Sequence, residues 1–117
     1  MDNIRDLLGD LVRTEGINTA VVVSRDGFVI EGVSTGDVDT EAVGAVVASG
    51  IGAAEVMGRE LMTGEMTQGM LEYKNGVIVM STLGMDAILA VVADLSAKLG
   101  SVRYQVKKSM PKLLDVL

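Results

Sequence analysis

The chain has 117 residues, and its ten Lys and Arg against sixteen Asp and Glu give a formal net charge of −6. This balance argues against a nucleic-acid-binding protein, which needs a basic surface to follow a phosphate backbone. The sequence contains no Cys and no His, which excludes disulfides, thiolate or imidazole metal ligands, and Ser-His or Cys-His nucleophiles. Hydrophobic residues make up 49% of the chain, and this predicts that a partner or a second copy covers part of the apolar surface.

We expect neither a targeting segment nor membrane insertion. Met1–Asp6 is charged from the start and lacks a basic region followed by an apolar run. The longest uncharged stretch, Ala42–Ala54, is shorter than the roughly 20 residues that cross a bilayer. The sequence therefore predicts a soluble cytoplasmic protein, with a single domain over residues 1–117.

The first segment has the apolar stripe of an amphipathic helix, spaced at i, i+3, i+4, i+7 and i+8. The stripe consists of Ile4, Leu7, Leu8, Leu11 and Val12. Asp2 or Asn3 is a suitable cap for the free N–H groups at its start, and Gly16 is a suitable stop. One side of this helix therefore needs a surface to pack on.

Two β-branched runs follow, Thr19–Ser24 and Phe28–Val33. The Asp26-Gly27 pair between them predicts a tight hairpin in which both central residues adopt positive φ. Val21–Val23 has no polar alternation, which predicts a strand that is covered on both faces.

A long helix is predicted from Asp39 or Thr40 to Met62, ended by Gly64. Seven side chains share the face that we expect on the sheet: Val43, Val46, Val47, Gly50, Ala54, Met57 and Leu61. The other face carries Ala45, Ala48, Gly52, Glu55 and Arg59, and a ladder of small residues four apart runs beside it through Gly44, Ala48 and Gly52. Small residues four apart let another backbone approach closely. Two explanations remain open, a helix-to-helix contact across a dimer and tight packing inside one domain.

Three more strands are predicted, at Met66–Lys74, Val77–Leu83 and Ala87–Ala93. Asn75-Gly76 is a second hairpin turn signal. Met66–Lys74 mixes polar and apolar residues as an edge strand does, and an open edge favours pairing with another chain.

The last predicted helix begins after Gly100 and is expected to kink or break at Pro111, which lacks an N–H donor. Its basic side chains, Arg103, Lys107, Lys108 and Lys112, form either a solvated face or a site for an acidic partner. The order α-β-β-α-β-β-β-α predicts an α+β fold with an antiparallel sheet.

No catalytic, metal or cofactor site is apparent in the sequence. The acids are scattered, so no pair is set for general acid–base work. Gly50-Ile51-Gly52 lies inside a predicted helix with Glu55 at the third glycine position, which argues against a dinucleotide-binding loop. Arg59 follows Glu55 by one turn and either pairs with it or reaches a carboxylate or phosphate of a partner. We therefore expect a protein that is not an enzyme and needs no cofactor.

The order of these segments resembles Roadblock/dynein light-chain domains. The resemblance is carried by residues 21–31 (VVVSRDGFVIE), the small-residue second helix, residues 75–79 (NGVIV), residues 87–93 (AILAVVA) and residues 99–103 (LGSVR). The resemblance covers essentially the whole chain. It is strongest for the prokaryotic MglB-like branch, whose members are partners of Ras-like GTPases.

The resemblance implies a five-stranded antiparallel sheet with the second helix on one face and the other two helices on the opposite face. It also implies a homodimer, with third strands paired edge to edge and second helices side by side, through Gly44, Ala48, Gly52, Thr67, Gly69, Leu71 and Tyr73. A small Ras-like GTPase would then bind near Ala45, Glu55, Arg59 and Met62, and its GTP hydrolysis would be modulated without chemistry from this chain. The alternatives are a structural adaptor that ignores nucleotide state and, with less support, a small-molecule sensor.

Overall fold

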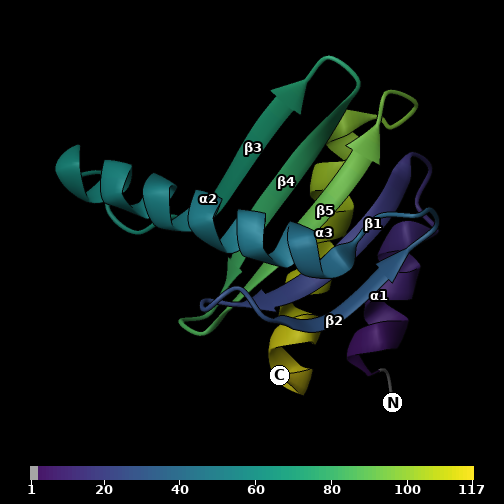
Figure 1. Cartoon of the computed structure of the whole chain (residues 1–117), viewed down its shortest axis with the longest axis horizontal. Helices are drawn as coiled ribbons and strands as arrows, with labels where there is room; N and C mark the ends of the chain where they lie inside the picture. Colours follow the sequence, from purple (N-terminus) through teal and green to yellow (C-terminus); the bar gives the residue numbers. More distant parts are fainter. Residues whose placement is uncertain (1–2) are drawn as a thin grey trace.

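The computed structural model describes residues 3–117 as a five-stranded antiparallel sheet with three helices (Figure 1). The elements are α1 (Ile4–Val12), β1 (Ile17–Ser24), β2 (Val29–Ser34), α2 (Thr40–Glu60), β3 (Gln68–Tyr73), β4 (Gly76–Leu83), β5 (Ala87–Asp94) and α3 (Leu99–Val116). The strand order is β2-β1-β5-β4-β3, so the edges are β2 and β3. The predicted fold class, element order and edge position of the third strand are confirmed.

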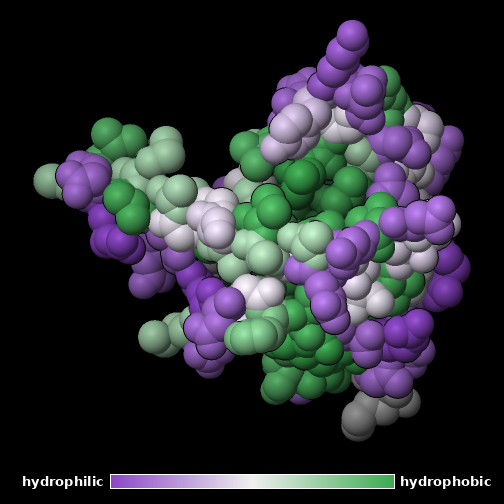
Figure 2. All heavy atoms as spheres, viewed as in Figure 1, coloured by the Kyte–Doolittle hydropathy of each residue, from purple (hydrophilic) through white to green (hydrophobic). Residues whose placement is uncertain are grey.

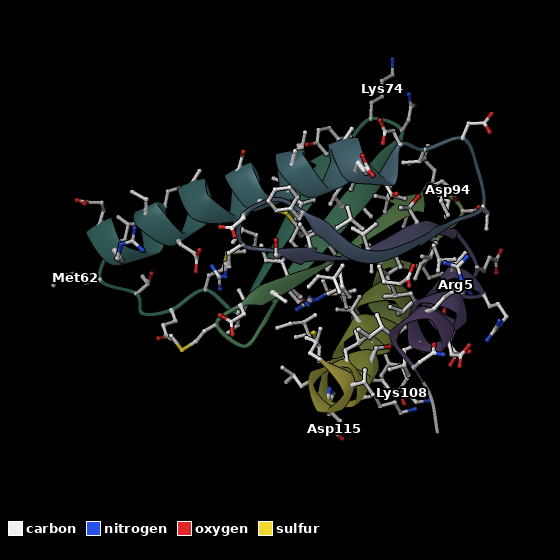
Figure 3. The ribbon with its side chains drawn as sticks, turned by 60° about the horizontal axis from the view of Figure 1, so that its bottom comes forward. Arg5, Met62, Lys74, Asp94, Lys108 and Asp115 are labelled. Atoms are coloured by element: carbon white, nitrogen blue, oxygen red, sulfur yellow. The ribbon has the colours of Figure 1, made fainter. Side chains whose placement is uncertain are left out.

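The helices form two layers, with α2 on one face of the sheet and α1 and α3 on the other (Figure 3). The α1 and α3 side holds the larger core, in which Leu8, Leu11, Leu89, Val102 and Leu113 are fully or almost fully buried. The α2 side holds a smaller core that includes Val21, Val23, Val47, Ile51 and Ile88. β1 contributes to both cores, since Val21, Val22 and Val23 are all fully buried, as the unbroken apolar run predicted.

α1 begins where the sequence suggested, because the Asn3 side chain accepts a hydrogen bond from the Asp6 N–H at 2.8 Å. Asp2, the other candidate cap, lies outside the described residues. Gly16 follows the helix in the left-handed region with φ 87°, four residues after α1 ends.

The first hairpin is in the predicted place, but its turn differs from the prediction. Only Gly27 has positive φ, at 93°. The Gly27 N–H donates to the Ser24 carbonyl at 3.0 Å, and the Ser24 N–H donates to the Phe28 carbonyl at 2.8 Å. This is a three-residue loop with a left-handed glycine at its end, in which Asp26 keeps an ordinary conformation.

The second hairpin is shifted by one residue from the prediction. Tyr73 pairs with Gly76, so Lys74 and Asn75 form the loop, and Gly76 opens β4. A Cβ at Gly76 would lie 2.6 Å from the Ala93 carbonyl oxygen. Glycine is needed here because the neighbouring strand comes close to the backbone, and not because the turn requires positive φ.

Pro111 does not end the last helix, which contradicts the predicted break. α3 is a single helix through Val116 with Pro111 inside it. Leu113, two residues further on, is completely buried and packs in the larger core together with partly buried Val116. This burial outweighs the hydrogen bond that proline removes from the helix.

Candidate partner-binding surface

α2 lies across the sheet in its first half and extends beyond it in its second half. Figure 1 shows the C-terminal end of α2 projecting past β3. The buried residues of the helix are Gly44, Val47 and Ile51, whereas Met57 is 62% exposed and Leu61 just after the helix is 70% exposed. Both were predicted to face the sheet. They do not, because the sheet ends before this part of the helix.

The packed side of α2 is also turned by roughly 60° from the predicted one. Val46 was expected on the sheet but is 69% exposed, while Gly44 was expected on the small-residue face but is buried. An exposed apolar strip consequently runs along the outer side of α2, through Ala42, Val46, Ala53, Val56 and Met57. We call these five residues the α2 strip. Exposed apolar surface of this kind is typical of an interaction site.

The ladder Gly44, Ala48, Gly52 is not one continuous free surface. A Cβ at Gly44 would lie 2.8 Å from Val29 Cγ2 and 3.1 Å from the Gly27 carbonyl oxygen, so Gly44 allows the β1–β2 hairpin to approach within the same chain. Ala48 is half-buried, and only Gly52 has open space around it. For Gly44, packing inside the chain is therefore the correct explanation, and its assignment to a dimer surface is wrong.

The sheet has an apolar patch beside α2 that the helix leaves uncovered. Figure 2 shows a hollow of apolar side chains next to the helix. Leu71, Ile78 and Val92 form a row across β3, β4 and β5, and all three are at least partly exposed. We call this row the sheet row. Sequence reasoning missed Ile78 and Val92, because their apolar runs are typical of buried strands.

β3 completes this surface with an unpaired edge. It pairs with β4 on one side only, and its side chains alternate between the two faces of the sheet. Leu71 and Tyr73 are 44% and 56% exposed and lie on the α2 face together with Gly69. Thr67 precedes the strand and lines a groove near α3 instead, so it is separated from the other three predicted edge residues.

Glu55 makes an ion pair that the sequence did not reveal. Its carboxylate accepts from Arg25 Nη1 at 2.5 Å, and the two side chains are only 26% and 31% exposed. The backbone N–H of Arg25 also donates to the Asp86 carbonyl at 3.2 Å. Arg25 therefore connects the β1–β2 turn and the β4–β5 turn to α2. The pair of Glu55 with Arg59, which was one of the two alternatives for Arg59, is not formed, because Glu55 lies on the flank of the helix that faces the β1–β2 turn.

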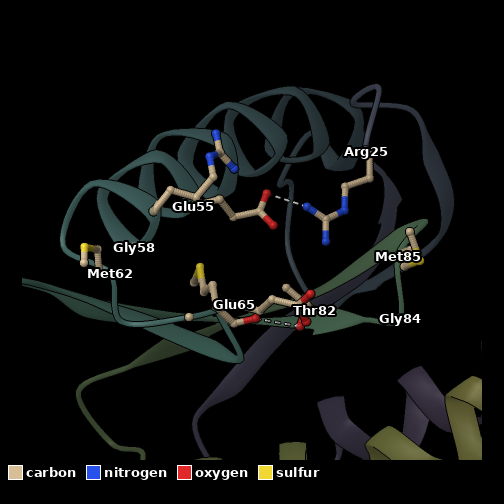
Figure 4. A pocket seen from close by; sticks show the side chains of 11 residues that line it. Arg25, Glu55, Gly58, Met62, Glu65, Thr82, Gly84 and Met85 are labelled. Atoms are coloured by element: carbon tan, nitrogen blue, oxygen red, sulfur yellow. Dashed lines mark hydrogen bonds and ion pairs between the residues drawn. The ribbon is translucent and has the colours of Figure 1, made fainter.

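An open pocket of about 680 Å³ lies beneath the C-terminal half of α2 (Figure 4). Arg25, Glu55 and Arg59 line it from one side, and Met66 and Thr82 from the other. Within residues 3–117, no carboxylate lies within 4.0 Å of the Arg59 guanidinium, and Arg25 Nε is buried without a hydrogen-bond partner. The pocket therefore brings together two cations, Arg25 and Arg59, two carboxylates, Glu55 and Glu65, and apolar surface.

The remaining predicted partner-binding residues are close to this pocket or accessible. Met62 is 85% exposed and has a left-handed backbone with φ 55°, at the point where the chain leaves α2. Ala45 is exposed and its Cα lies near the Gly27 turn. Among the described residues, no group of three or more Asp or Glu side chains is placed to hold a metal ion.

α2 is also long and apolar enough, by length and composition alone, to cross a membrane. This criterion is weak for a single helix. One side of α2 is fixed to the sheet by Val47 and Ile51, and Glu55 is held by Arg25.

These features together define a small α+β domain with an exposed apolar helix surface and an open strand edge. The family model for the Roadblock/LC7 domain matches residues 3–93, and the chain belongs to this family.

Two relatives and one solved structure illustrate the relationship. The uncharacterized protein MJ0310 of Methanocaldococcus jannaschii is 37% identical over 107 residues, which cover 92% of this chain and 93% of that protein. The Ragulator complex protein LAMTOR2 homolog of Caenorhabditis elegans is 31% identical over 98 residues, covering 84% and 76% of the two chains. The structure of Myxococcus xanthus MglB has a TM-score of 0.89 at 20% identity, covering 97% of this chain and 86% of that one. At this identity the similarity to MglB establishes a shared fold.

Proposed function

We propose that this chain is a homodimeric, non-enzymatic cytoplasmic regulator or scaffold that binds a small Ras-like GTPase. The observation that carries the proposal is the pairing of two exposed apolar surfaces, the α2 strip and the sheet row, on the same side of the molecule. The resemblance to the MglB-like branch supplies the identity of the partner, and that step is an analogy between folds.

The geometry favours a dimer through the β3 edge. If two β3 strands paired, each α2 would continue past its own sheet edge and lie over the sheet of the other copy. The exposed end of α2 at Leu61 would then approach the partner's sheet row, and Met57, at the margin of the α2 strip, would approach the partner's α2. Each copy has both the projecting half-helix and the open hollow that it would fill, which is the self-complementarity that a two-fold interface requires.

The GTPase would bind across the outer surface of the two α2 helices. Ala45, Arg59 and Met62 are exposed in the protomer and remain candidates for this contact. Glu55 is engaged by Arg25, so its contribution would be to hold the helix in place. The chain would affect hydrolysis by positioning groups of the GTPase, and it would supply no acid, base or nucleophile itself.

Light scattering tests the dimer with a pair of methionine variants. Met57→Glu places a charge on the α2 strip, whereas Met85→Glu does so at an equally accessible turn, where Met85 is 88% exposed. We expect the wild type and Met85→Glu to show twice the chain mass of 12.2 kDa, and Met57→Glu to shift toward the monomer. A monomeric wild type at micromolar concentration, or an unaffected Met57→Glu dimer, would remove the proposed interface.

The partner is tested with candidate Ras-like GTPases from the same organism, each loaded with GDP or with a non-hydrolysable GTP analogue. We expect tighter binding of one nucleotide state and a changed rate of GTP hydrolysis, and both effects should be weakened by Arg59→Glu. Equal binding of the two states without a change in hydrolysis would favour the alternative of a structural adaptor. No binding at all would refute the proposed partner.

A further inference from the structure

A second concave surface lies on the opposite side of the sheet from α2. α3 packs below the larger core and leaves the underside of β3 uncovered, which creates a groove of about 480 Å³ between α3 and the start of β3. Gln68 and Ser81 line it from the strands, and Arg103, Tyr104, Lys107 and Met110 from the helix. This groove plays no part in the function proposed above.

The groove is basic in an acidic protein. Its lining includes Arg103 and Lys107 and no carboxylate. α3 carries four cations against one carboxylate, Asp115, which leaves six cations against fifteen carboxylates in the rest of the chain. Within residues 3–117, no cation of α3 forms an ion pair. The positive charge of this helix is therefore concentrated and not neutralised within the described chain.

The strands hold one wall of the groove in place through a hydrogen bond, and α3 forms the other wall. Gln68 Nε2 donates to the Ser81 Oγ at 3.2 Å, and Ser81 is only 2% exposed. Arg103 and Lys107 are four residues apart and so lie on one flank of α3. Tyr104 is 62% exposed, and Met110 is partly buried against the core. The groove thus combines two cations at its rim with apolar surface.

We propose that this groove binds an acidic segment of a partner protein. A carboxylate of the segment lies between Arg103 and Lys107, where the planar guanidinium offers paired donors. A neighbouring apolar side chain of the segment packs against Tyr104 and Met110. The rest of the chain is acidic and repels such a segment elsewhere, so that the binding is confined to α3.

Nucleic acid and membrane surfaces fit the groove less well. A phosphate backbone continues past two cations onto the acidic remainder of the protein, where it is repelled. An anionic bilayer is flat and broad, while this site is recessed. Glu72 lies on the same face of β3 as Gln68 and Met70, and its carboxylate would repel an anionic lipid surface.

The inference does not depend on the GTPase or on the dimer. The groove and α2 lie on opposite faces of the sheet, so one chain can hold an acidic segment and another partner at the same time. If β3 edges do pair, two such grooves face the same side of the extended sheet. The protein would then connect two acidic segments to whatever binds α2.

The test uses a fluorescein-labelled peptide in which Asp and Glu alternate with Leu, and a control peptide with Asn and Gln in place of the acids. Two double variants reverse the same number of charges on α3. Arg103→Glu with Lys107→Glu changes the groove, and Lys108→Glu with Lys112→Glu changes residues outside its lining. Figure 3 places Lys108 on the side of α3 away from the sheet. We expect the groove variant to weaken binding of the acidic peptide at least about tenfold and the control variant less than about threefold.

Amide chemical shifts locate the bound peptide. We expect changes at residues 67–68, 81 and 100–110 on addition of the acidic peptide and none with the neutral one. Circular dichroism checks that each variant is folded, and Arg103→Gln with Lys107→Gln replaces the groove variant if it is not. Equal losses in the two charge-reversed variants, no preference for the acidic peptide, or tighter binding to single-stranded DNA or to phosphatidylserine vesicles would overturn the proposal. The groove variant should keep the mass of the wild type in light scattering and its binding to the GTPase. The peptide result then tests the groove independently of the proposed dimer and GTPase partner.

Discussion

Gly44 and Gly52 lie two turns apart on α2 in opposite surroundings, and replacing each with alanine provides a matched test of the packing. A methyl at Gly44 would lie 2.8 Å from Val29 Cγ2 and 3.1 Å from a backbone oxygen, whereas a methyl at Gly52 would have no neighbour within 4 Å. Both substitutions gain helix propensity of up to about 1 kcal/mol. Overpacking at Gly44 costs roughly 1–3 kcal/mol. We therefore expect Gly44→Ala to lower the free energy of unfolding by about 1 kcal/mol and Gly52→Ala to raise it by up to about 1 kcal/mol.

Urea denaturation followed by circular dichroism measures both variants against the wild type. The two variants should differ by about 2 kcal/mol, which corresponds to roughly 6–10 °C in melting temperature. Each measurement is repeated at a tenfold higher protein concentration, because the stability of a dimer depends on concentration. Equal stability of Gly44→Ala and Gly52→Ala would show that the hairpin does not press against α2 at Gly44, and the revised orientation of the helix would be wrong.

Three further predictions concern separate features. A double-mutant cycle with Arg25→Met and Glu55→Gln should give a coupling energy of roughly 0.5–1 kcal/mol, reduced in 1 M NaCl, because the pair is partly solvated; no coupling would contradict the ion pair. Pro111→Ala restores an N–H donor toward the Lys107 carbonyl and should raise the free energy of unfolding in urea by roughly 1–2 kcal/mol; a loss of stability would mean that the proline conformation is favoured in α3. Hydrogen bonds from the Ser96 hydroxyl and then the Ser96 N–H lower the pKa of Asp94, so Ser96→Ala should raise that pKa in a carbon-13 NMR titration. The pKa of Asp94 is lower in the folded than in the unfolded chain, so its contribution to stability is present above the unfolded pKa and is lost as pH falls through the folded pKa. An unchanged Asp94 titration in Ser96→Ala would show that the Ser96 hydrogen bonds do not lower this pKa.

The elements of this fold could be predicted because their signals are local. The apolar stripe of Ile4–Val12, the β-branched run around Val21–Val23 and the two turn pairs each depend on neighbouring residues. The details that failed depend on contacts between distant segments. Position 76 requires glycine because the backbone of Ala93 comes close to it across the sheet. The helix continues past Pro111 because Leu113 is buried in the core.

The candidate site was predictable as a region but not in its pattern of contacts. The mixed composition of the third strand correctly predicted a sheet edge at β3, whereas the small residues of α2 did not predict which of its residues are exposed, since Gly44 is buried and Val46 is exposed. The periodicity of α2 could not tell where the sheet beneath it ends, so Met57 and Leu61 were assigned to a core that does not reach them. Nor could it pair Glu55 with Arg25, thirty residues earlier in the chain. Such pairings follow from the three-dimensional arrangement of the hairpins.

The projection of α2 beyond its sheet has a consequence for how such proteins diverge. Substitutions of Val47 or Ile51 in the first half of the helix disturb the smaller core and so affect folding of the protomer. Substitutions beyond Ala54 leave that packing intact, apart from the Glu55 contact. Related chains can therefore acquire new binding preferences through this half of the helix while retaining the same foldable scaffold.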